Sequence, residues 1–308
     1  MGKIAFIFPG QGAQHVGMGQ EIISNYVESK KVFDQANDLL DFDLYELCNT
    51  ENTQINDTAY TQVALLSVSI ATLKVIEYMG VKADYLAGLS LGEYSALVAS
   101  GLLSFDEAID IVRKRGQYMQ ESALETDGGM AAIIGSNQEA ILEVFNQVEG
   151  YLTIANYNSS KQIVIAGERD ALNKSYPIFE AAKIKVIPLN VSGAFHSELM
   201  AGAAEKLRPK LESVTFNEYK TPYLSNVTGK VVTDTSHIKN LLITQVKSPV
   251  LWENNILEMI ELGVDTFIEI GPGNTLAGLI KKIDRKKKVI SVNGIDGLEE
   301  LKTFMEVR

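Results

Sequence analysis

Short, mostly apolar runs alternate with helical patterns along much of the chain. Residues 4–8, 84–87 and 266–270 each end in a Gly or Pro turn, and a helical pattern follows each run. Runs of this kind predict buried strands, and their alternation with helices predicts an α/β layer with a mainly parallel sheet. Residues 62–78 are apolar almost all round, which predicts a helix buried beneath that sheet.

The pattern changes between about residues 129 and 189. There it predicts a strand, a helix, two strands, a helix and a final strand. This β-α-β-β-α-β order is that of the ferredoxin-like unit. Because the earlier alternation resumes afterwards, we interpret residues 127–193 as a small subdomain inserted into a large one, which residues 1–126 and 194–308 form.

A candidate nucleophile lies between a predicted strand and a predicted helix. The sequence Gly-Leu-Ser-Leu-Gly at residues 88–92 follows the strand and precedes a helical run over residues 93–99. Glycines two residues either side of Ser90 allow a turn tight enough to expose its hydroxyl, and the following helix N-terminus favours negative charge nearby. The same string arises by chance in glycine-rich turns, but the flanking elements favour a nucleophile.

A serine nucleophile needs a general base, and the chain contains three histidines. His237 lies in a polar stretch, where a solvated or capping residue is the simpler interpretation. His15 follows a loop rich in Gly and Gln and is interpreted as a surface residue. His196 lies where the chain leaves the small subdomain, at a junction where a cleft is expected, so we favour His196.

Arg115 is a second unusual residue. In the helix predicted over residues 106–121, the 3.6-residue period places Arg115 on the apolar face. Arg113 points away from that face, and Lys114 has Asp110 as a surface partner. A guanidinium keeps its proton, so burial without an anion costs on the order of several kcal/mol. Two partners remain open: a carboxylate from a distant segment, or a substrate carboxylate held in a bidentate fork.

Composition limits the classes of partner and compartment. The formal net charge of -11 and pI near 4.9 argue against binding to nucleic acid or an anionic membrane. The single cysteine, Cys48, excludes an internal disulfide and a cysteine-rich metal site, and it fits a reducing compartment. No apolar run is long enough to span a bilayer. We therefore expect a cytoplasmic protein without a metal site.

Several short motifs follow one another along the chain. They are Phe-Pro-Gly-Gln-Gly-Ala-Gln at residues 8–14, Ala-Gly-Leu-Ser-Leu-Gly-Glu at 87–93, Arg-Gly at 115–116, Gly-Ala-Phe-His at 193–196 and Ile-Glu-Ile-Gly-Pro-Gly at 268–273. In this order they resemble the motifs of malonyl-CoA:acyl carrier protein transacylases, and the match covers essentially the whole chain. The resemblance implies an α/β-hydrolase-like core with a ferredoxin-like subdomain closing one side of the cleft.

The resemblance also implies roles for individual residues. Ser90 would be the nucleophile and His196 the general base, which later acts as general acid. Arg115 would hold the malonyl carboxylate. The backbone N–H groups of Gln11 and Leu91 would form the oxyanion hole that stabilises the tetrahedral intermediate.

Two further positions follow from the same resemblance. In this family an amide carbonyl orients the histidine, and Gln245 resembles that position. Asn158 matches a position lining the same cleft. The alternative for both residues is a polar side chain that caps a loop or helix end, and for Asn158 this alternative explains the residue equally well. Many polyketide synthase acyltransferase domains carry a histidine before the serine, where this chain has Leu89. In this respect the chain resembles a free-standing enzyme of fatty acid synthesis more than a polyketide synthase domain. The aromatic Phe195 before the histidine resembles malonyl-selective members, so we expect malonyl over methylmalonyl.

The implied reaction moves a malonyl group from coenzyme A to the phosphopantetheine thiol of acyl carrier protein. Coenzyme A thioester is then a substrate, and we expect no cofactor and a monomer. The carrier is usually acidic, so basic residues must gather locally, either at residues 281–288 or at Lys183 and Lys185. The alternatives are a free-standing polyketide-type acyltransferase, a serine thioesterase or ester hydrolase, and a non-catalytic carrier-binding subunit.

Overall fold

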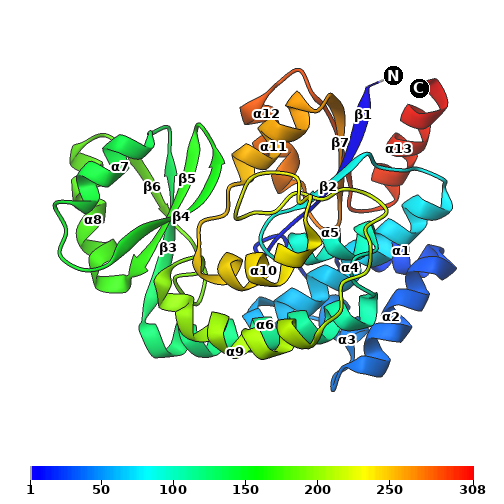
Figure 1. The fold of residues 1–308 in the computed structure, drawn as a ribbon, viewed down its shortest axis with the longest axis horizontal. Coiled ribbons are helices and arrows are strands. Elements are labelled where there is room, and N and C mark those ends of the chain that lie inside the picture. The colour runs from blue at the N-terminus through cyan, green and yellow to red at the C-terminus, as the bar shows by residue number, and fades with distance from the viewer. Residues whose placement is uncertain (1) are drawn as a thin grey trace.

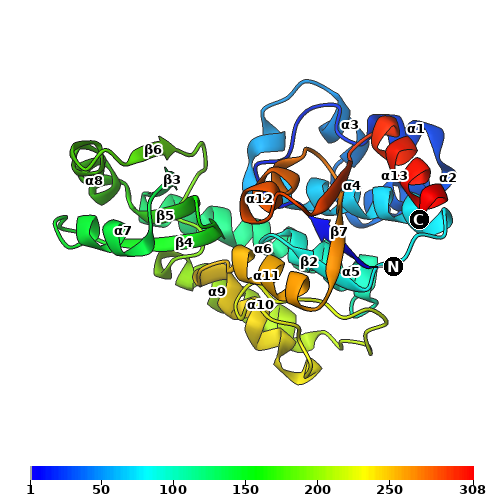
Figure 2. The same cartoon turned by 90° about the horizontal axis from the view of Figure 1, so that it is seen from above.

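The computed structural model describes residues 2–308, which form a larger and a smaller α/β part around two separate sheets (Figures 1 and 2). The larger sheet has the strand order β2-β1-β7-β8, and every pairing in it is parallel. Its strands are β1 (Lys3–Phe8), β2 (Tyr85–Gly88), β7 (Val264–Ile270) and β8 (Lys288–Val292). The predicted α/β fold with a parallel sheet is therefore confirmed.

Helices surround both sheets. Their bounds are α1 (Gln20–Asn25), α2 (Val27–Leu39), α3 (Leu44–Asn49), α4 (Thr58–Tyr78), α5 (Gly92–Ser100), α6 (Phe105–Thr126), α7 (Gln138–Phe145), α8 (Arg169–Ala181), α9 (Ala201–Ser213), α10 (Ile238–Lys247), α11 (Trp252–Glu261), α12 (Thr275–Ile283) and α13 (Ile295–Val307). Figure 1 shows α11 and α12 on one side of the larger sheet and α4 and α5 on the other.

The central strand β1 is buried on both faces, which explains why its sequence is continuously apolar. Ile4, Phe6 and Phe8 belong to the core that contains α4, whereas Ala5 and Ile7 belong to the core beneath α11 and α12. The helix α4 is apolar all round because it is enclosed. The expectation that no apolar run is long enough to span a bilayer was wrong by length and composition, because α4 is the one described helix long and apolar enough to do so. However, 89% of that window is buried inside the protein.

The smaller sheet has the order β4-β5-β3-β6, and its pairings are all antiparallel. Its strands are β3 (Gly128–Ile134), β4 (Leu152–Ser159), β5 (Gln162–Glu168) and β6 (Lys185–Pro188). Along the chain the order is strand, helix, strand, strand, helix, strand, as the sequence predicts. The two helices, α7 and α8, pack on this sheet around a separate apolar cluster that includes Phe179.

Candidate active site

Ser90 lies at a sharp turn between β2 and α5, with its backbone in the left-handed region at φ 53°. The two flanking glycines are required by close backbone approaches. A Cβ at Gly88 would collide with the backbone of Gly92, and a Cβ at Gly92 would collide with the carbonyl of Phe8. The sequence Gly-Leu-Ser-Leu-Gly therefore forms the tight turn expected from its spacing.

Two buried amide side chains hold this turn. The Asn226 Oδ1 accepts from the Ser90 backbone N–H at 2.6 Å, and its Nδ2 donates to the Gly88 carbonyl at 2.7 Å. The Gln245 Nε2 donates to the Ser90 carbonyl at 3.0 Å. A left-handed backbone costs a non-glycine residue about 1–2 kcal/mol, and these hydrogen bonds offset that cost.

His196 lies beside the serine, and both of its ring nitrogens are engaged. Its Nε2 is 2.8 Å from the Ser90 Oγ, and its Nδ1 is 2.7 Å from the main-chain carbonyl oxygen of Gln245. A carbonyl only accepts, so Nδ1 carries the proton and Nε2 is free to accept one from the serine. Burial, and secondly the charge of Arg115, lower the His196 pKa to about 4, so the imidazole is neutral at neutral pH.

The other two histidines lie apart from this arrangement. Both are exposed: His15 contacts the carbonyl of Ala13, and His237 lies 3.3 Å from Asp234. Of the three, the structure brings only His196 to Ser90.

Arg115 is buried, with 1% of its surface exposed, and the groups it contacts are neutral. Its Nη1 donates to the Gln62 Oε1 at 2.7 Å, and its Nη2 donates to the Gln245 Oε1 at 3.0 Å and to the Ser90 Oγ at 3.2 Å. Within residues 2–308, its Nε has no hydrogen-bond partner and no carboxylate lies within 4.0 Å of the guanidinium. Burial lowers its pKa. The distant-carboxylate alternative is therefore not what the structure contains.

The helix α6 sets this position. Its capping box, formed by Ser104 and Glu107, fixes the start of the helix. The Arg113 Nη1 donates to the Ala59 carbonyl, and its guanidinium stacks on Phe42 and Tyr60, away from Ser90. The two arginines therefore diverge as the helical period predicts.

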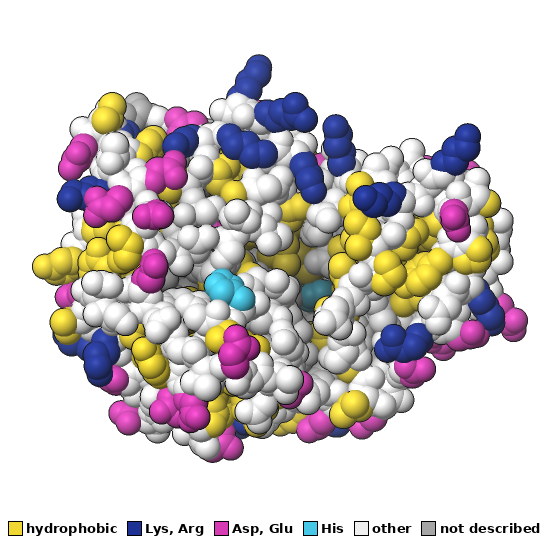
Figure 3. Space-filling view, turned by 180° about the vertical axis from the view of Figure 1, so that it is seen from behind, with side chains coloured by type: hydrophobic (Ala, Val, Ile, Leu, Met, Phe, Trp, Pro, Cys, Tyr) yellow, Lys and Arg dark blue, Asp and Glu magenta, His cyan; other side chains and the backbone are white. Residues whose placement is uncertain are grey.

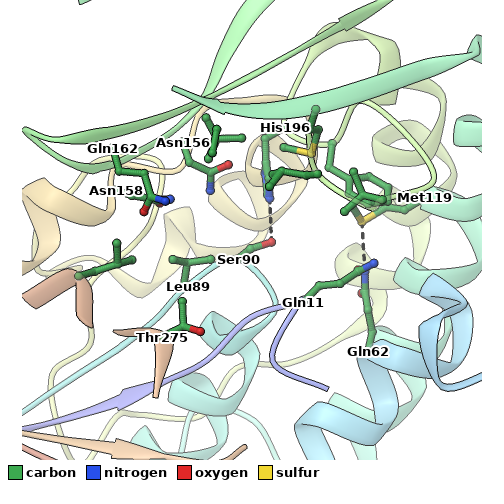
Figure 4. A pocket seen from close by; sticks show the side chains of 17 residues that line it. Gln11, Gln62, Leu89, Ser90, Met119, Asn156, Asn158, Gln162, His196 and Thr275 are labelled. Carbon is green, nitrogen blue, oxygen red and sulfur yellow. Dashed lines mark hydrogen bonds between the residues drawn. The ribbon is translucent and has the colours of Figure 1, made fainter. Parts of the chain in front are cut away.

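A cavity of about 230 Å³ opens above Ser90, between the two sheets. Its lining comes from both parts: Gln11, Gln62, Leu89, Ser90, Met119, Met130, Ala132, Asn156, Asn158, Gln162, Val164, Leu189, Val191, Phe195, His196, Thr275 and Leu279. Figure 4 shows Asn156 and Asn158 projecting from β4 toward the side where Ser90 and His196 meet. The Asn158 Oδ1 is buried and has no partner in the described chain.

The two residues expected to supply backbone N–H groups also border Ser90. Gln11 lines the cavity, and Leu91 follows the serine at the start of α5. Neither backbone N–H has a hydrogen-bond partner among residues 2–308, so both are free to donate. The Gln11 side chain is engaged elsewhere, with Thr58 at 3.1 Å.

The sequence interpretation missed three buried polar residues of this site. Gln62 binds Arg115, Asn226 holds the turn, and Glu93 accepts from the Gln245 Nε2 at 2.7 Å. An amide within the otherwise apolar α4 is a signal of the same kind as the arginine on an apolar face, and it would have identified Gln62.

Comparison with known proteins agrees with this arrangement. The model of the acyl transferase domain family matches residues 5–299. The malonyl CoA-acyl carrier protein transacylase of Bacillus subtilis is 44% identical over 304 residues, which cover 97% of this chain and 96% of that protein. The chain belongs to the malonyl CoA-acyl carrier protein transacylase family.

Solved transacylase structures share the whole fold. The transacylase of Clostridium perfringens superposes with a TM-score of 0.95 at 41% identity, covering 99% of this chain and 97% of that one. A malonyl-transacylase in complex with a type II polyketide acyl-carrier protein gives a TM-score of 0.93 at 37% identity, covering 96% and 98%. The likeness to this family therefore extends to both sheets.

Proposed function

We propose that this chain transfers a malonyl group from malonyl-CoA to the phosphopantetheine thiol of acyl carrier protein through a malonyl-Ser90 intermediate. One observation carries the proposal: the Ser90 Oγ lies 2.8 Å from a neutral imidazole and 3.2 Å from a buried guanidinium that has only neutral partners. A nucleophile, its base and a site for an acyl carboxylate thus meet at one oxygen atom.

In the first half-reaction, the His196 Nε2 takes the hydroxyl proton while the Ser90 Oγ attacks the thioester carbonyl. The backbone N–H groups of Gln11 and Leu91 stabilise the oxyanion. The intermediate collapses, the carbon–sulfur bond breaks, and His196 returns the proton to the leaving thiolate of coenzyme A. In the second half-reaction, the carrier's thiol gives its proton to the His196 Nε2 and attacks the carbonyl of the malonyl-Ser90 ester. The ester bond then breaks, and His196 returns the proton to the Ser90 Oγ.

Arg115 supplies the preference for a malonyl group. Its Nε is unpartnered in the described chain, and its Nη2, which here donates to Gln245 and Ser90, would turn to the acyl carboxylate to complete a bidentate pair. Such a pair would fix the thioester carbonyl over Ser90. An acyl group without a carboxylate would leave the buried cation unpaired. Phe195 in the cavity wall limits the space for a methylmalonyl branch, and Asn158 offers a free amide oxygen to the substrate.

We also infer which known folds the two parts of the chain resemble. The order β4-β5-β3-β6 and the β-α-β-β-α-β succession support a ferredoxin-like subdomain of residues 127–193. The serine turn on a parallel sheet supports an α/β-hydrolase-like part formed by residues 1–126 and 194–308. We place the enzyme in the cytoplasm, as a monomer without a cofactor that acts in fatty acid synthesis.

The carrier would approach along a basic rim. Figure 3 shows Lys and Arg side chains along the upper edge of the face that is hollowed between the two parts. In the described chain, Lys282 in the last turn of α12 and Arg285 and Lys286 after it have no carboxylate partner, and neither do Lys183 and Lys185 beside β6. Both groups expected from the sequence therefore offer exposed, unpaired charge to an acidic partner.

Intact-protein mass spectrometry tests the proposal. After brief mixing with malonyl-CoA, the wild type should gain one malonyl group and Ser90→Ala should gain none. Addition of a carrier protein bearing its phosphopantetheine arm should remove the adduct and load the carrier. Coenzyme A release without an adduct would indicate a hydrolase, and neither adduct nor release would indicate a non-catalytic binding subunit.

A further inference from the structure

Glu93 is a fully buried carboxylate for which the transfer reaction has no step. It lies in the first turn of α5, three residues after the nucleophile, with 0% of its surface exposed. Its Oε2 accepts from the Asn226 backbone N–H at 3.1 Å and from the Gln245 Nε2 at 2.7 Å. Its Oε1 has no partner within residues 2–308. A buried carboxylate with only neutral donors is costly, so its presence calls for a further reason.

The two partners of Glu93 are the same amides that hold the site. Asn226 binds the backbone on either side of Leu89, at the Gly88 carbonyl and the Ser90 N–H. Gln245 also contacts the catalytic groups: its Nε2 binds the Ser90 carbonyl, its Oε1 accepts from Arg115, and its main-chain carbonyl binds the histidine. Glu93 therefore reaches the nucleophile, the base and the guanidinium through one intervening residue.

Glu93 also affects the charge of Arg115. The side-chain amide of Gln245 separates the two groups, and within residues 2–308 Glu93 is the carboxylate whose charge acts on the guanidinium. Tyr94 on α5 and Tyr223 are the other titratable groups that face Glu93. A substrate carboxylate that binds Arg115 would therefore be repelled by Glu93 across the Gln245 amide, in a buried site where water screens charge little.

We propose that Glu93 is a positioning residue: its hydrogen bonds to Asn226 and Gln245 aim Ser90 and Arg115, and its charge weakens the hold of Arg115 on the acyl carboxylate. The inference rests on the proposed function, because it concerns the same malonyl group. Glu93 touches no substrate. It acts on kcat through geometry and on the malonyl-CoA KM through charge, and the two effects are separable by substitution.

The test compares Glu93→Gln and Glu93→Ala in steady-state and single-turnover acylation at pH 8, with malonyl-CoA and acetyl-CoA as donors. A glutamine oxygen accepts both hydrogen bonds without the charge. Glu93→Gln should therefore keep kcat within about threefold, while the KM for malonyl-CoA falls on the order of tenfold and that for acetyl-CoA stays unchanged. Glu93→Ala removes both anchors and should slow acylation by both donors on the order of 100-fold.

The control is Glu269→Gln, because Glu269 is equally buried but anchors the start of α12 through the N–H groups of Leu276 and Ala277. It should lower stability and leave the ratio of malonyl to acetyl use unchanged. Wild-type acylation by Glu93→Ala would overturn the positioning role. An unchanged malonyl-CoA KM in Glu93→Gln, or a loss as large as that of Glu93→Ala, would overturn the charge role.

The failure of this inference differs from a failure of the proposed function. A wild type that forms no malonyl-Ser90 adduct would refute the function before any Glu93 variant is measured. A wild type that forms the adduct, with Glu93 variants that match it in both kcat and KM, would refute the inference alone. Should Glu93→Ala not fold, Glu93→Gln still decides the charge role, because it removes the charge and keeps both hydrogen bonds.

Discussion

Two buried groups, Glu93 and His196, should make the free energy of unfolding depend on pH in opposite directions. Burial raises the pKa of Glu93 from 4.5 to about 7. The folded state therefore holds a proton that the unfolded state releases, and stability present below pH 4.5 is lost as pH rises through 7. Burial lowers the pKa of His196 from 6.5 to about 4. Stability from that group is present above pH 6.5 and is lost as pH falls through 4.

The two contributions are of similar size. Each pKa unit corresponds to about 1.4 kcal/mol, so each group changes the free energy of unfolding by about 3 kcal/mol across its range. Between pH 4.5 and 6.5 the contributions have opposite slopes and nearly cancel in the wild type. The substitution Glu93→Gln removes one of them. Its stability relative to the wild type should rise by about 3 kcal/mol from pH 4.5 to pH 7.

Urea denaturation at intervals from pH 4.5 to pH 8 measures this difference, because titration of the exposed carboxylates cancels between variant and wild type. His196→Gln supplies a control of opposite sign: its stability relative to the wild type should increase as pH falls from 6.5 toward 4.5. Parallel curves for Glu93→Gln and wild type would show that Glu93 does not titrate in this range, and would refute the reasoning.

Three further results are expected. Arg115→Ala should lower kcat/KM for malonyl-CoA on the order of 100- to 1000-fold and for acetyl-CoA far less, whereas Arg113→Ala on the same helix should change neither; equal losses would remove the assigned role. Gly92→Ala should lower the free energy of unfolding by about 2–4 kcal/mol in thermal or urea denaturation, because its Cβ meets backbone; an unchanged stability would contradict the tight turn. Lys282→Glu with Lys286→Glu should raise the KM for carrier protein in transfer assays while malonyl-Ser90 formation stays at the wild-type rate, and an unchanged KM would shift docking to the β6 side.

Those parts of the fold with a strong local signal could be predicted from the sequence. The central strand β1 is almost continuously apolar because both faces of the sheet are covered, and the order of elements around residues 129–189 follows from turn positions. Burial of Arg115 could be predicted because a cation on an apolar helix face departs from the surrounding pattern. The turn at Ser90 could be predicted because its glycines are needed at fixed spacing.

The parts that could not be predicted depend on contacts between distant segments. Asn226 lies in an irregular stretch, and no periodicity indicates that its side chain binds residues more than 130 positions earlier. The strand β8 was also missed, because a run of basic residues precedes its short apolar stretch. Whether Arg115 met a carboxylate from a distant segment or was kept for a substrate carboxylate was left open, since the answer depends on which residues fold against it, here Gln62 and Gln245.

The neutral surroundings of Arg115 give selectivity a physical basis. A guanidinium already paired with a protein carboxylate would gain little from a substrate carboxylate, because one anion would only replace another. Here, among residues 2–308, the guanidinium has only amide and hydroxyl acceptors, and its Nε has no acceptor. Without substrate its charge therefore has no anionic partner in the described chain, and an acyl carboxylate would supply one. Glu93 is separated from Arg115 by the Gln245 side chain, and its negative charge limits how strongly Arg115 binds the acyl carboxylate. A group that must be captured from one thioester and released to another requires this intermediate strength, since binding the intermediate too tightly would slow the second half-reaction.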